Sequence, residues 1–137
     1  VDAMYCLYQA GSFAKTVKAY QRSCEDPVAL RAGDAVIVDE QRSKDTDVLG
    51  WLWVRGPDGR EGWAPEAWLS GDGERRVISR DFNAIELDVA AGETVELLIG
   101  ESGFAWCRKP NGDEGWLWQA VLALMPGAQL RAVDETS

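Results

Sequence analysis

Histidine is missing from this chain of 137 residues, and with it goes the commonest general base and metal ligand of proteins. No P-loop, paired-glycine phosphate motif or GxSxG nucleophile motif takes its place. The sequence therefore argues against an enzyme, and we expect neither a metal site nor a cofactor.

Basic residues are also scarce, since 14 Lys and Arg stand against 23 Asp and Glu and give a net charge of −9. A surplus of negative charge opposes a phosphate backbone or an anionic lipid surface and suits a basic partner. No apolar run approaches the roughly 18 residues that a membrane-spanning helix needs. We therefore expect no nucleic-acid binding and no direct membrane binding.

Cysteine is limited to Cys6, Cys24 and Cys107, without a CxxC spacing. An odd number cannot all pair within the chain, and free thiols are typical of a reducing compartment. The first ten residues, VDAMYCLYQA, lack the basic start and the apolar stretch of a signal peptide, and there is no initiator methionine. These features predict a cytoplasmic protein and a piece of a larger polypeptide.

Two stretches of the chain occur twice in altered form. LRAGDAVIV at 30–38 corresponds to VAAGETVEL at 89–97, and WLWVRGPDGREGW at 51–63 corresponds to FAWCRKPNGDEGW at 104–116. The DG and NG pairs inside the longer stretches are strong signals for β-hairpins. Short strands with frequent turns favour a small β-barrel or sandwich, here built twice in domains of about 55 to 60 residues.

Four elements of the first copy follow one another in a characteristic order: TVKAY at 16–20, VALRAGD at 28–34, GWLWVR at 50–55 and WAPEAWL at 63–69. This order resembles the Src-homology-3 (SH3) domain. The resemblance implies an all-β fold with two small SH3-like five-stranded β-barrels in tandem. The implied parts are an N-terminal extension (1–13), a first SH3 domain (14–70), a short linker (71–76), a second SH3 domain (77–124) and a C-terminal tail (125–137).

The two ends of the chain carry separate expectations. The N-terminal extension is too apolar for a free tail, so we expect it to add a strand or to pack on one copy. The C-terminal tail is expected to fray after Pro126.

SH3 domains bind proline-rich peptides in a polyproline II conformation between aromatic rings. The resemblance implies that the groove floor of the first copy consists of Tyr20, Trp51, Pro65 and Trp68, and that Glu25 and Asp26 pair with an Arg or Lys of the ligand. Carboxylates of the enlarged loop would assist, namely Asp39, Glu40, Asp45 and Asp47. Lys18 and Ala67 replace a tyrosine and an asparagine of the family pattern, which predicts a modest affinity.

The second copy departs further from the family pattern. It keeps RDF at 80–82 and ELDVAAGE at 86–93, but Phe104 replaces the ligand-gripping tryptophan, Trp118 the proline and Val121 the final tyrosine. Its acidic loop is also shorter, because nine residues separate Phe82 from Gly92 and twelve separate Tyr20 from Gly33. We expect a degenerate groove in which Phe104, Trp118 and Val121 pack against the first copy or the N-terminal segment.

Two functional hypotheses stay open. The first is a non-enzymatic tandem SH3 module of a larger cytoplasmic signalling or scaffold protein, which binds a proline-rich, basic peptide in cis or in trans through the first copy. The second is a structural or regulatory unit that packs on its parent protein without binding PxxP peptides. The WVRxPDGxEGW pattern is similar to SH3 domains of Dbl-family Rho guanine-nucleotide exchange factors, which fits the second hypothesis.

Overall fold

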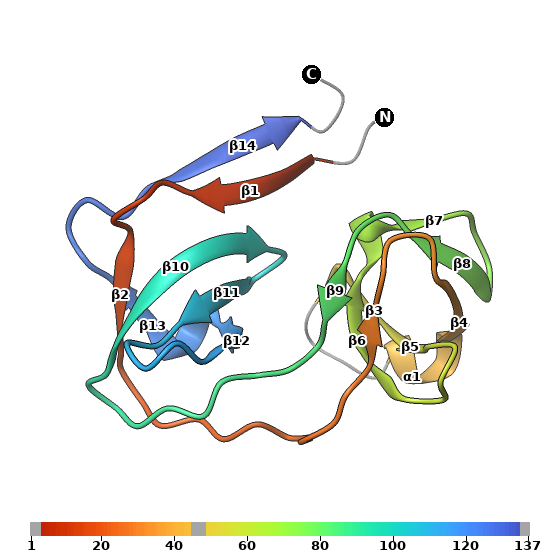
Figure 1. The fold of residues 1–137 in the computed structure, drawn as a ribbon, viewed down its shortest axis with the longest axis horizontal. Helices are drawn as coiled ribbons and strands as arrows, with labels where there is room; N and C mark the ends of the chain where they lie inside the picture. Colours follow the sequence, from red (N-terminus) through yellow and green to blue (C-terminus); the bar gives the residue numbers. More distant parts are fainter. Residues whose placement is uncertain (1–3, 45–48, 135–137) are drawn as a thin grey trace. The chain divides into compact units, whose positions relative to one another are not determined.

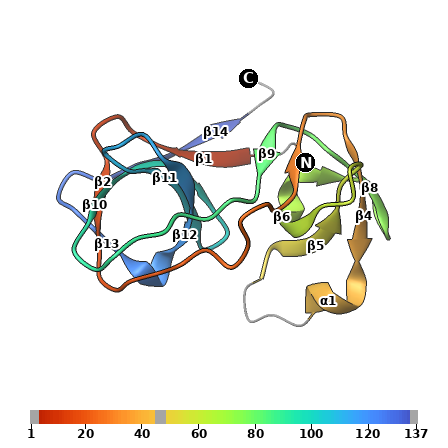
Figure 2. The same cartoon turned by 60° about the horizontal axis from the view of Figure 1, so that its bottom comes forward.

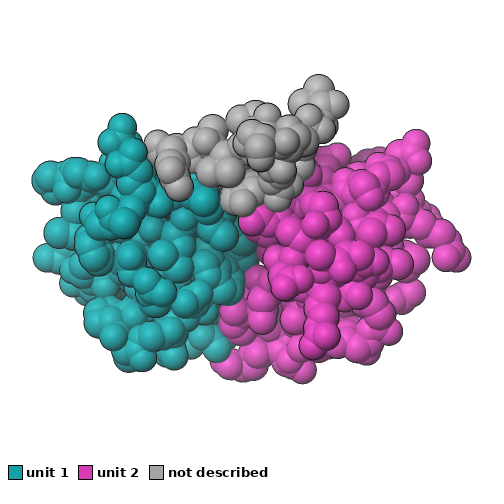
Figure 3. All heavy atoms as spheres, turned by 45° about the horizontal axis from the view of Figure 1, so that its top comes forward, with its two compact units in different colours: residues 1–23, 86–137 teal, residues 24–85 magenta. Residues whose placement is uncertain are grey.

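The computed structural model describes the backbone of residues 4–44 and 49–134, and the side chains of residues 7–44 and 49–129. The described elements are β-strands, two short 3₁₀ turns and a single short α-helix, as the all-β prediction requires (Figure 1). The chain forms two compact units, of which unit 1 holds residues 1–23 and 86–137 and unit 2 holds residues 24–85. Figure 2 gives a second view of the elements, and Figure 3 colours unit 1 teal and unit 2 magenta.

Unit 2 is one continuous stretch of chain. Its elements are β3 (Ala29–Leu30), β4 (Ala35–Asp39), α1 (Glu40–Lys44), β5 (Trp51–Arg55), β6 (Glu61–Pro65), η1 (Glu66–Trp68), β7 (Leu69–Ser70), β8 (Arg75–Ile78) and β9 (Phe82–Asn83). Five strands form an antiparallel sheet in the order β6-β5-β4-β8-β7, and β3 pairs with β9. Five is the expected strand number, but among the described strands this sheet is open, with β6 and β7 at its edges.

Unit 1 is assembled from both ends of the chain. Its elements are β1 (Met4–Tyr8), β2 (Phe13–Thr16), β10 (Thr94–Glu101), β11 (Phe104–Arg108), β12 (Glu114–Trp118), η2 (Gln119–Val121), β13 (Leu122–Leu124) and β14 (Leu130–Asp134). The sheet has seven strands rather than five, in the order β12-β11-β10-β1-β14, while β2 pairs with both β10 and β13. It too is open among the described strands.

The repeated sequence produces the same hairpin in each unit. β5 and β6 are joined through Gly59 (φ 89°), and β11 and β12 are joined through Gly112 (φ 96°). Both backbone angles lie in the left-handed region that glycine adopts without strain, which is why the DG and NG signals predict these turns.

Each hairpin also carries a pair of tryptophans directly opposite one another. Trp53 and Trp63 meet edge to face with ring centroids 5.2 Å apart, and Trp106 and Trp116 do so at 5.4 Å. In each pair the indole of the first ring donates to a carboxylate of the same hairpin, Glu61 at 2.9 Å and Glu114 at 2.8 Å. The tryptophans of the strands therefore serve sheet packing, as their strand positions predict.

The core of unit 1 contains the inward-facing residues of its sheet. Alternate residues of β2 and β10 are buried, in keeping with the two-residue period of a strand. The buried cluster consists of Ala14, Leu87, Val89, Val95, Leu97, Ala105, Cys107, Leu117 and Val121. In unit 2 the fully buried aliphatic side chains are Val28, Val36, Val54 and Ile78.

The structure corrects the expected domain boundaries of 14–70 and 77–124. β2 belongs to unit 1, where it pairs with β10 and β13, whereas β8 and β9 belong to unit 2, where they pair with β4, β7 and β3. Residues 71–76, expected to be a linker between domains, form the turn between β7 and β8 and the first residues of β8. The reason is that each repeat offers a sheet edge of the same pattern, so the first strand of one repeat fits the sheet of the other.

The chain ends form paired strands. β1 confirms the expected added strand, because it pairs with β10 on one side and with β14 on the other (Figure 1). The prediction that the tail frays after Pro126 is wrong for residues 130–134, which pair with β1 from Met4↔Asp134 to Tyr8↔Leu130. β14 is ordered because β1 offers it a free edge with five consecutive partners.

Candidate functional site

The structure divides the predicted groove floor between the two units. Tyr20 lies in unit 1, whereas Trp51, Pro65 and Trp68 lie in unit 2. In unit 2, Trp51 is 6% exposed and Trp68 is 3% exposed, and Pro65 is fully buried. These three residues form a buried cluster of unit 2.

Local structure explains why these three residues turn inward. Pro65 ends β6 directly opposite Trp51 on β5, which is where a residue without an N–H is tolerated in a sheet. The backbone N–H of Glu66 then donates to the carbonyl of Gly50 at 2.9 Å, and η1 carries Trp68 into the interior.

Two residues that sequence reasoning did not assign complete this cluster. The Phe82 ring lies 6.4 Å from that of Trp51 and 5.6 Å from that of Trp68, measured between centroids. The guanidinium of Arg80 lies 4.5 Å from the centroid of the Trp68 ring. Both come from the RDF sequence of the second copy, which occupies here the place expected for the first copy's own aromatic segment.

The predicted acidic residues Glu25 and Asp26 are exposed in unit 2. Asp26 accepts a hydrogen bond from Nη1 of Arg60 at 2.7 Å, and Asp58 pairs with the same guanidinium at 2.8 Å. The hydrogen bonds that Arg60 donates to Asp26 and then to Asp58 raise the pKa of Arg60. A ligand cation at Asp26 would therefore compete with Arg60.

The acidic residues predicted to assist from the enlarged loop differ in what the structure shows of them. Asp39 accepts a hydrogen bond from the backbone N–H of Arg42 at 2.9 Å and so caps α1, which begins at Glu40. Asp45 and Asp47 lie outside the described residues.

Unit 1 has an exposed aromatic surface, which we define by Lys18, Phe104 and Trp118. Trp118 is 44% exposed at the end of β12 and lies directly opposite the half-buried Phe104 of β11. The Nζ of Lys18 lies 5.6 Å from the centroid of the Trp118 ring, within range of a cation–π interaction. This surface combines the start of the first repeat with the hairpin of the second.

Tyr20, half-buried and two residues after Lys18, contacts a group of carboxylates. Its hydroxyl donates to Oε2 of Glu86 at 2.6 Å, and burial and then Glu86 raise the pKa of Tyr20. The other carboxylate oxygen of Glu86 accepts from the hydroxyl of Ser23 at 3.0 Å. Nearby, Asp88 accepts from the backbone N–H of Arg22 at 2.7 Å and lies 3.5 Å from its Nε. The signal for this acidic end was ELD at 86–88, within the second copy's shorter acidic loop.

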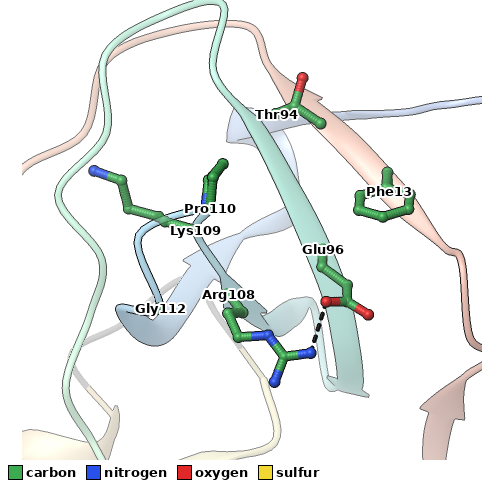
Figure 4. Close-up of a pocket in the computed structure, with 7 residues that line it drawn as sticks. All are labelled: Phe13, Thr94, Glu96, Arg108, Lys109, Pro110 and Gly112. Carbon is green, nitrogen blue, oxygen red and sulfur yellow. Dashed lines mark hydrogen bonds and ion pairs between the residues drawn. The ribbon is translucent and has the colours of Figure 1, made fainter.

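A pocket of about 280 Å³ lies elsewhere on unit 1, over β10, with Phe13 on one side and the turn of the β11–β12 hairpin on the other (Figure 4). Its lining residues are Phe13, Thr94, Glu96, Arg108, Lys109, Pro110 and Gly112. Arg108 donates to Glu96 at 2.7 Å, and Lys109 donates to the carbonyl of Asp88 at 2.9 Å. The charged groups of the pocket are thus engaged with neighbours.

The three residues expected to pack between the copies lie in different environments. Val121 is buried in the core cluster of unit 1, so its burial is explained within its own unit. Phe104 is half-buried and Trp118 is exposed. Packing of Trp118 against another part of the protein stays a prediction.

Several features bear on cofactors, redox chemistry and membranes. The described residues contain no group of three or more acidic or cysteine side chains arranged to hold a metal ion. Cys24 is an exposed free thiol and Cys107 a buried one, and burial raises the pKa of Cys107 to about 12. None of the helices in the described ranges has the length and apolar character to cross a membrane.

Comparisons with curated proteins and with solved structures found no significant match. Residues 13–71 match the family model of the variant SH3 domain, which is less than half of the chain. Domains of this family are generally non-enzymatic interaction modules. The matched stretch is continuous in sequence, but residues 13–23 belong to unit 1 and residues 24–71 to unit 2. Residues 13–71 are therefore similar to a variant SH3 domain, although β2 at their start pairs with β10 and β13 in the sheet of unit 1.

Proposed function

We propose that this chain is a non-enzymatic interaction module that binds a proline-rich segment carrying Arg or Lys, in cis or in trans. The observation that carries the proposal is the exposed aromatic surface of unit 1, where Trp118 keeps 44% of its area open beside Lys18 and Phe104. Polyproline II ligands stack on such rings, and they lose little conformational entropy because they are already extended.

Charge supports the same ligand class. Glu86 and Asp88 contact Tyr20 and Arg22, which follow Lys18 in the same segment, and the whole chain carries a net charge of −9. A ligand Arg or Lys is attracted to these carboxylates, and the attraction raises the rate of encounter more than the final affinity. We expect micromolar binding, about −7 to −8 kcal/mol.

The Trp51, Pro65 and Trp68 cluster is the second proposed location, and the SH3 match supports it. Its low exposure means that a peptide reaches these rings only if they become uncovered. For that reason we place the ligand first on the unit 1 surface.

The test is a titration of isotope-labelled protein with PxxP peptides that carry Arg, alongside matched peptides in which the Arg is Gln. The Arg peptides should shift amide resonances around Trp118 and Phe104, and Trp118→Ala should weaken binding about tenfold or more, the loss of roughly 1.4 kcal/mol of contact. Leu124→Ala is the control, because Leu124 is an exposed apolar residue that does not belong to the aromatic surface. Shifts confined to Trp51 and Trp68 would move the site to unit 2, and no shift at either place would reject peptide binding.

A second candidate function is a structural or regulatory unit of a larger parent protein, for example a Rho guanine-nucleotide exchange factor. Its support is that Phe82 and Arg80 already occupy the aromatic cluster of unit 2. In this case Trp118→Ala in the parent protein changes its activity or localisation, while PxxP peptides remain without effect. An unchanged parent protein would contradict this alternative.

A further inference from the structure

Two segments of the chain occupy equivalent places in opposite units. We name residues 13–20 donor segment 1, which belongs to the first repeat but lies in unit 1, and residues 75–82 donor segment 2, which opens the second repeat but lies in unit 2. Donor segment 1 pairs with β10 and β13, and donor segment 2 pairs with β4 and β7.

The backbone contacts of the two segments match one for one. Thr16 accepts from the N–H of Gly92 at 2.7 Å, as Ile78 does from Gly33 at 2.8 Å. The N–H of Thr16 donates to Glu93 at 2.8 Å, as that of Ile78 does to Asp34 at 3.0 Å. The N–H of Val17 donates to Val121 at 2.7 Å, as that of Ser79 does to Trp68 at 2.8 Å. In every case the partner residues in the two units are equivalent positions of the two repeats.

Side chains repeat the pattern. In both segments a cationic side chain lies over a tryptophan ring, Lys18 over Trp118 and Arg80 over Trp68, although Trp118 is the equivalent of Pro65 and not of Trp68. Tyr20 is paired with Val89, and Phe82 is paired with Leu30, which are again equivalent positions. Each acceptor edge therefore recognises a short extended segment by contacts that the opposite repeat can also supply.

From this equivalence we propose that the acceptor edges also take a donor segment from a second copy of this chain, so that two chains associate by exchanging donor segment 1. The N-terminal part of unit 1 ends at residue 23, so the same ladder with β10 and β13 forms whether this stretch comes from the same chain or from a second one. Exchange of an identical element is a known low-cost route to dimers, and it adds a strand to an open sheet edge.

The connecting stretches determine how the two forms compete. Two stretches connect the paired segments of the two units. Residues 21–28 connect Tyr20, which pairs with Val89, to β3, and residues 84–88 connect β9 to Val89. Short flexible connections give an effective concentration in the millimolar range, which favours closure within one chain. The form between chains should therefore grow as the protein concentration during folding is raised.

Directly opposed exposed residues allow the pairing to be captured as a disulfide. Lys15 of β2 lies opposite Ala123 of β13, and Val77 of β8 lies opposite Ser70 of β7 in the equivalent pair. With Cys6 and Cys24 replaced by Ser, the double variant Lys15→Cys/Ala123→Cys should close within one chain after dilute refolding. The matched control is Lys15→Cys/Ser70→Cys, which closes only if segment 1 pairs within its own repeat.

The exchange between chains is tested in the same Cys6→Ser/Cys24→Ser background with one added cysteine per chain. One chain carries Lys15→Cys, and the other, with a size tag, carries Ala123→Cys. They are unfolded, mixed, refolded together over a range of concentrations and oxidised. We expect a mixed covalent dimer whose yield increases with protein concentration. The control mixture combines Lys15→Cys with Asn111→Cys, whose cysteine lies in an exposed turn, and the yield should reach several times that of this control. The proposal is overturned if the mixed dimer never exceeds that control, or if the Lys15→Cys/Ser70→Cys chain closes in preference to the exchanged pair.

Discussion

Trp116 and Trp118 lie two positions apart on β12, yet their surroundings differ greatly. Trp116 is 4% exposed and packs edge to face on Trp106, whereas Trp118 is 44% exposed. Trp116→Ala should lower the free energy of unfolding by about 3 to 5 kcal/mol, the usual cost for a buried tryptophan. Trp118→Ala should cost about 1 kcal/mol or less, since exposed substitutions rarely cost more. Denaturant unfolding of both variants checks this, and equal losses would contradict the assigned environments.

At Tyr20 the structure predicts a pH dependence. Burial and the hydrogen bond to Glu86 raise its pKa above the ordinary 10.0, so above that pH the unfolded chain loses a phenolic proton that the folded chain keeps. The contribution to stability is complete below pH 10 and declines as the pH rises, because the unfolded state then binds fewer protons. Unfolding free energies between about pH 8 and 11 should fall more steeply for the unaltered protein than for Tyr20→Phe. Parallel curves would remove Tyr20 as the cause.

The two described cysteines should differ in reactivity. Cys24 is exposed, whereas burial raises the pKa of Cys107 to about 12 and shields its sulfur. In a Cys6→Ser background, a thiol reagent at neutral pH should modify one thiol per chain at once and the second only on unfolding, because the thiolate is the reactive form. Mass spectrometry of the digested protein assigns the sites. Rapid modification of Cys107 would show that the core of unit 1 opens readily.

At the scale of elements, the docking of β2 depends on one buried hydroxyl. Thr16 is 2% exposed, and its Oγ1 donates to the carbonyl of Ala90 at 2.6 Å and accepts from the N–H of Glu93 at 2.8 Å. Thr16→Val keeps the shape and leaves both backbone groups unsatisfied, which should cost about 1 to 3 kcal/mol of unfolding free energy. Lys15→Val, on the exposed face of the same strand, is the control. A loss no greater than that of the control would mean that water replaces the hydroxyl.

The strands were easier to predict from the sequence than the strands with which they pair. The DG and NG turns specify hairpins between neighbouring strands, so β5–β6 and β11–β12 follow directly from local residues. The pattern of β2 shows only that alternate side chains are buried, and this pattern suits the sheet edge of either repeat. The predicted groove joins Tyr20 with Trp51, which belong to different units, because a contact between distant segments depends on which repeat accepts the strand. The short acidic loop of the second repeat was the available sign, because short hinges favour exchange.

At the scale of the whole molecule, the structure predicts which fragment folds. Residues 24–85 contain every strand of unit 2, whereas residues 14–70, the linear choice, lack β8 and β9. Without β8 the sheet keeps only β6, β5 and β4, β7 loses its partner in that sheet, and the buried Ile78 is missing from the core. The 24–85 fragment should therefore show dispersed amide resonances and a cooperative thermal transition. Better dispersion from 14–70 would return the boundary to the linear arrangement.

The pairing of β1 with β14 has a mechanical consequence. Met4 lies opposite Asp134, and the ladder continues inward to Tyr8 and Leu130 (Figure 1). Tension applied at Met4 and Asp134 pulls across this antiparallel ladder, so its hydrogen bonds carry the load one pair after another instead of all together. The ladder should therefore peel apart at low force before the remaining strands of unit 1 are loaded. In an optical-tweezers experiment, this peeling would give a short, reversible extension that precedes the main rupture.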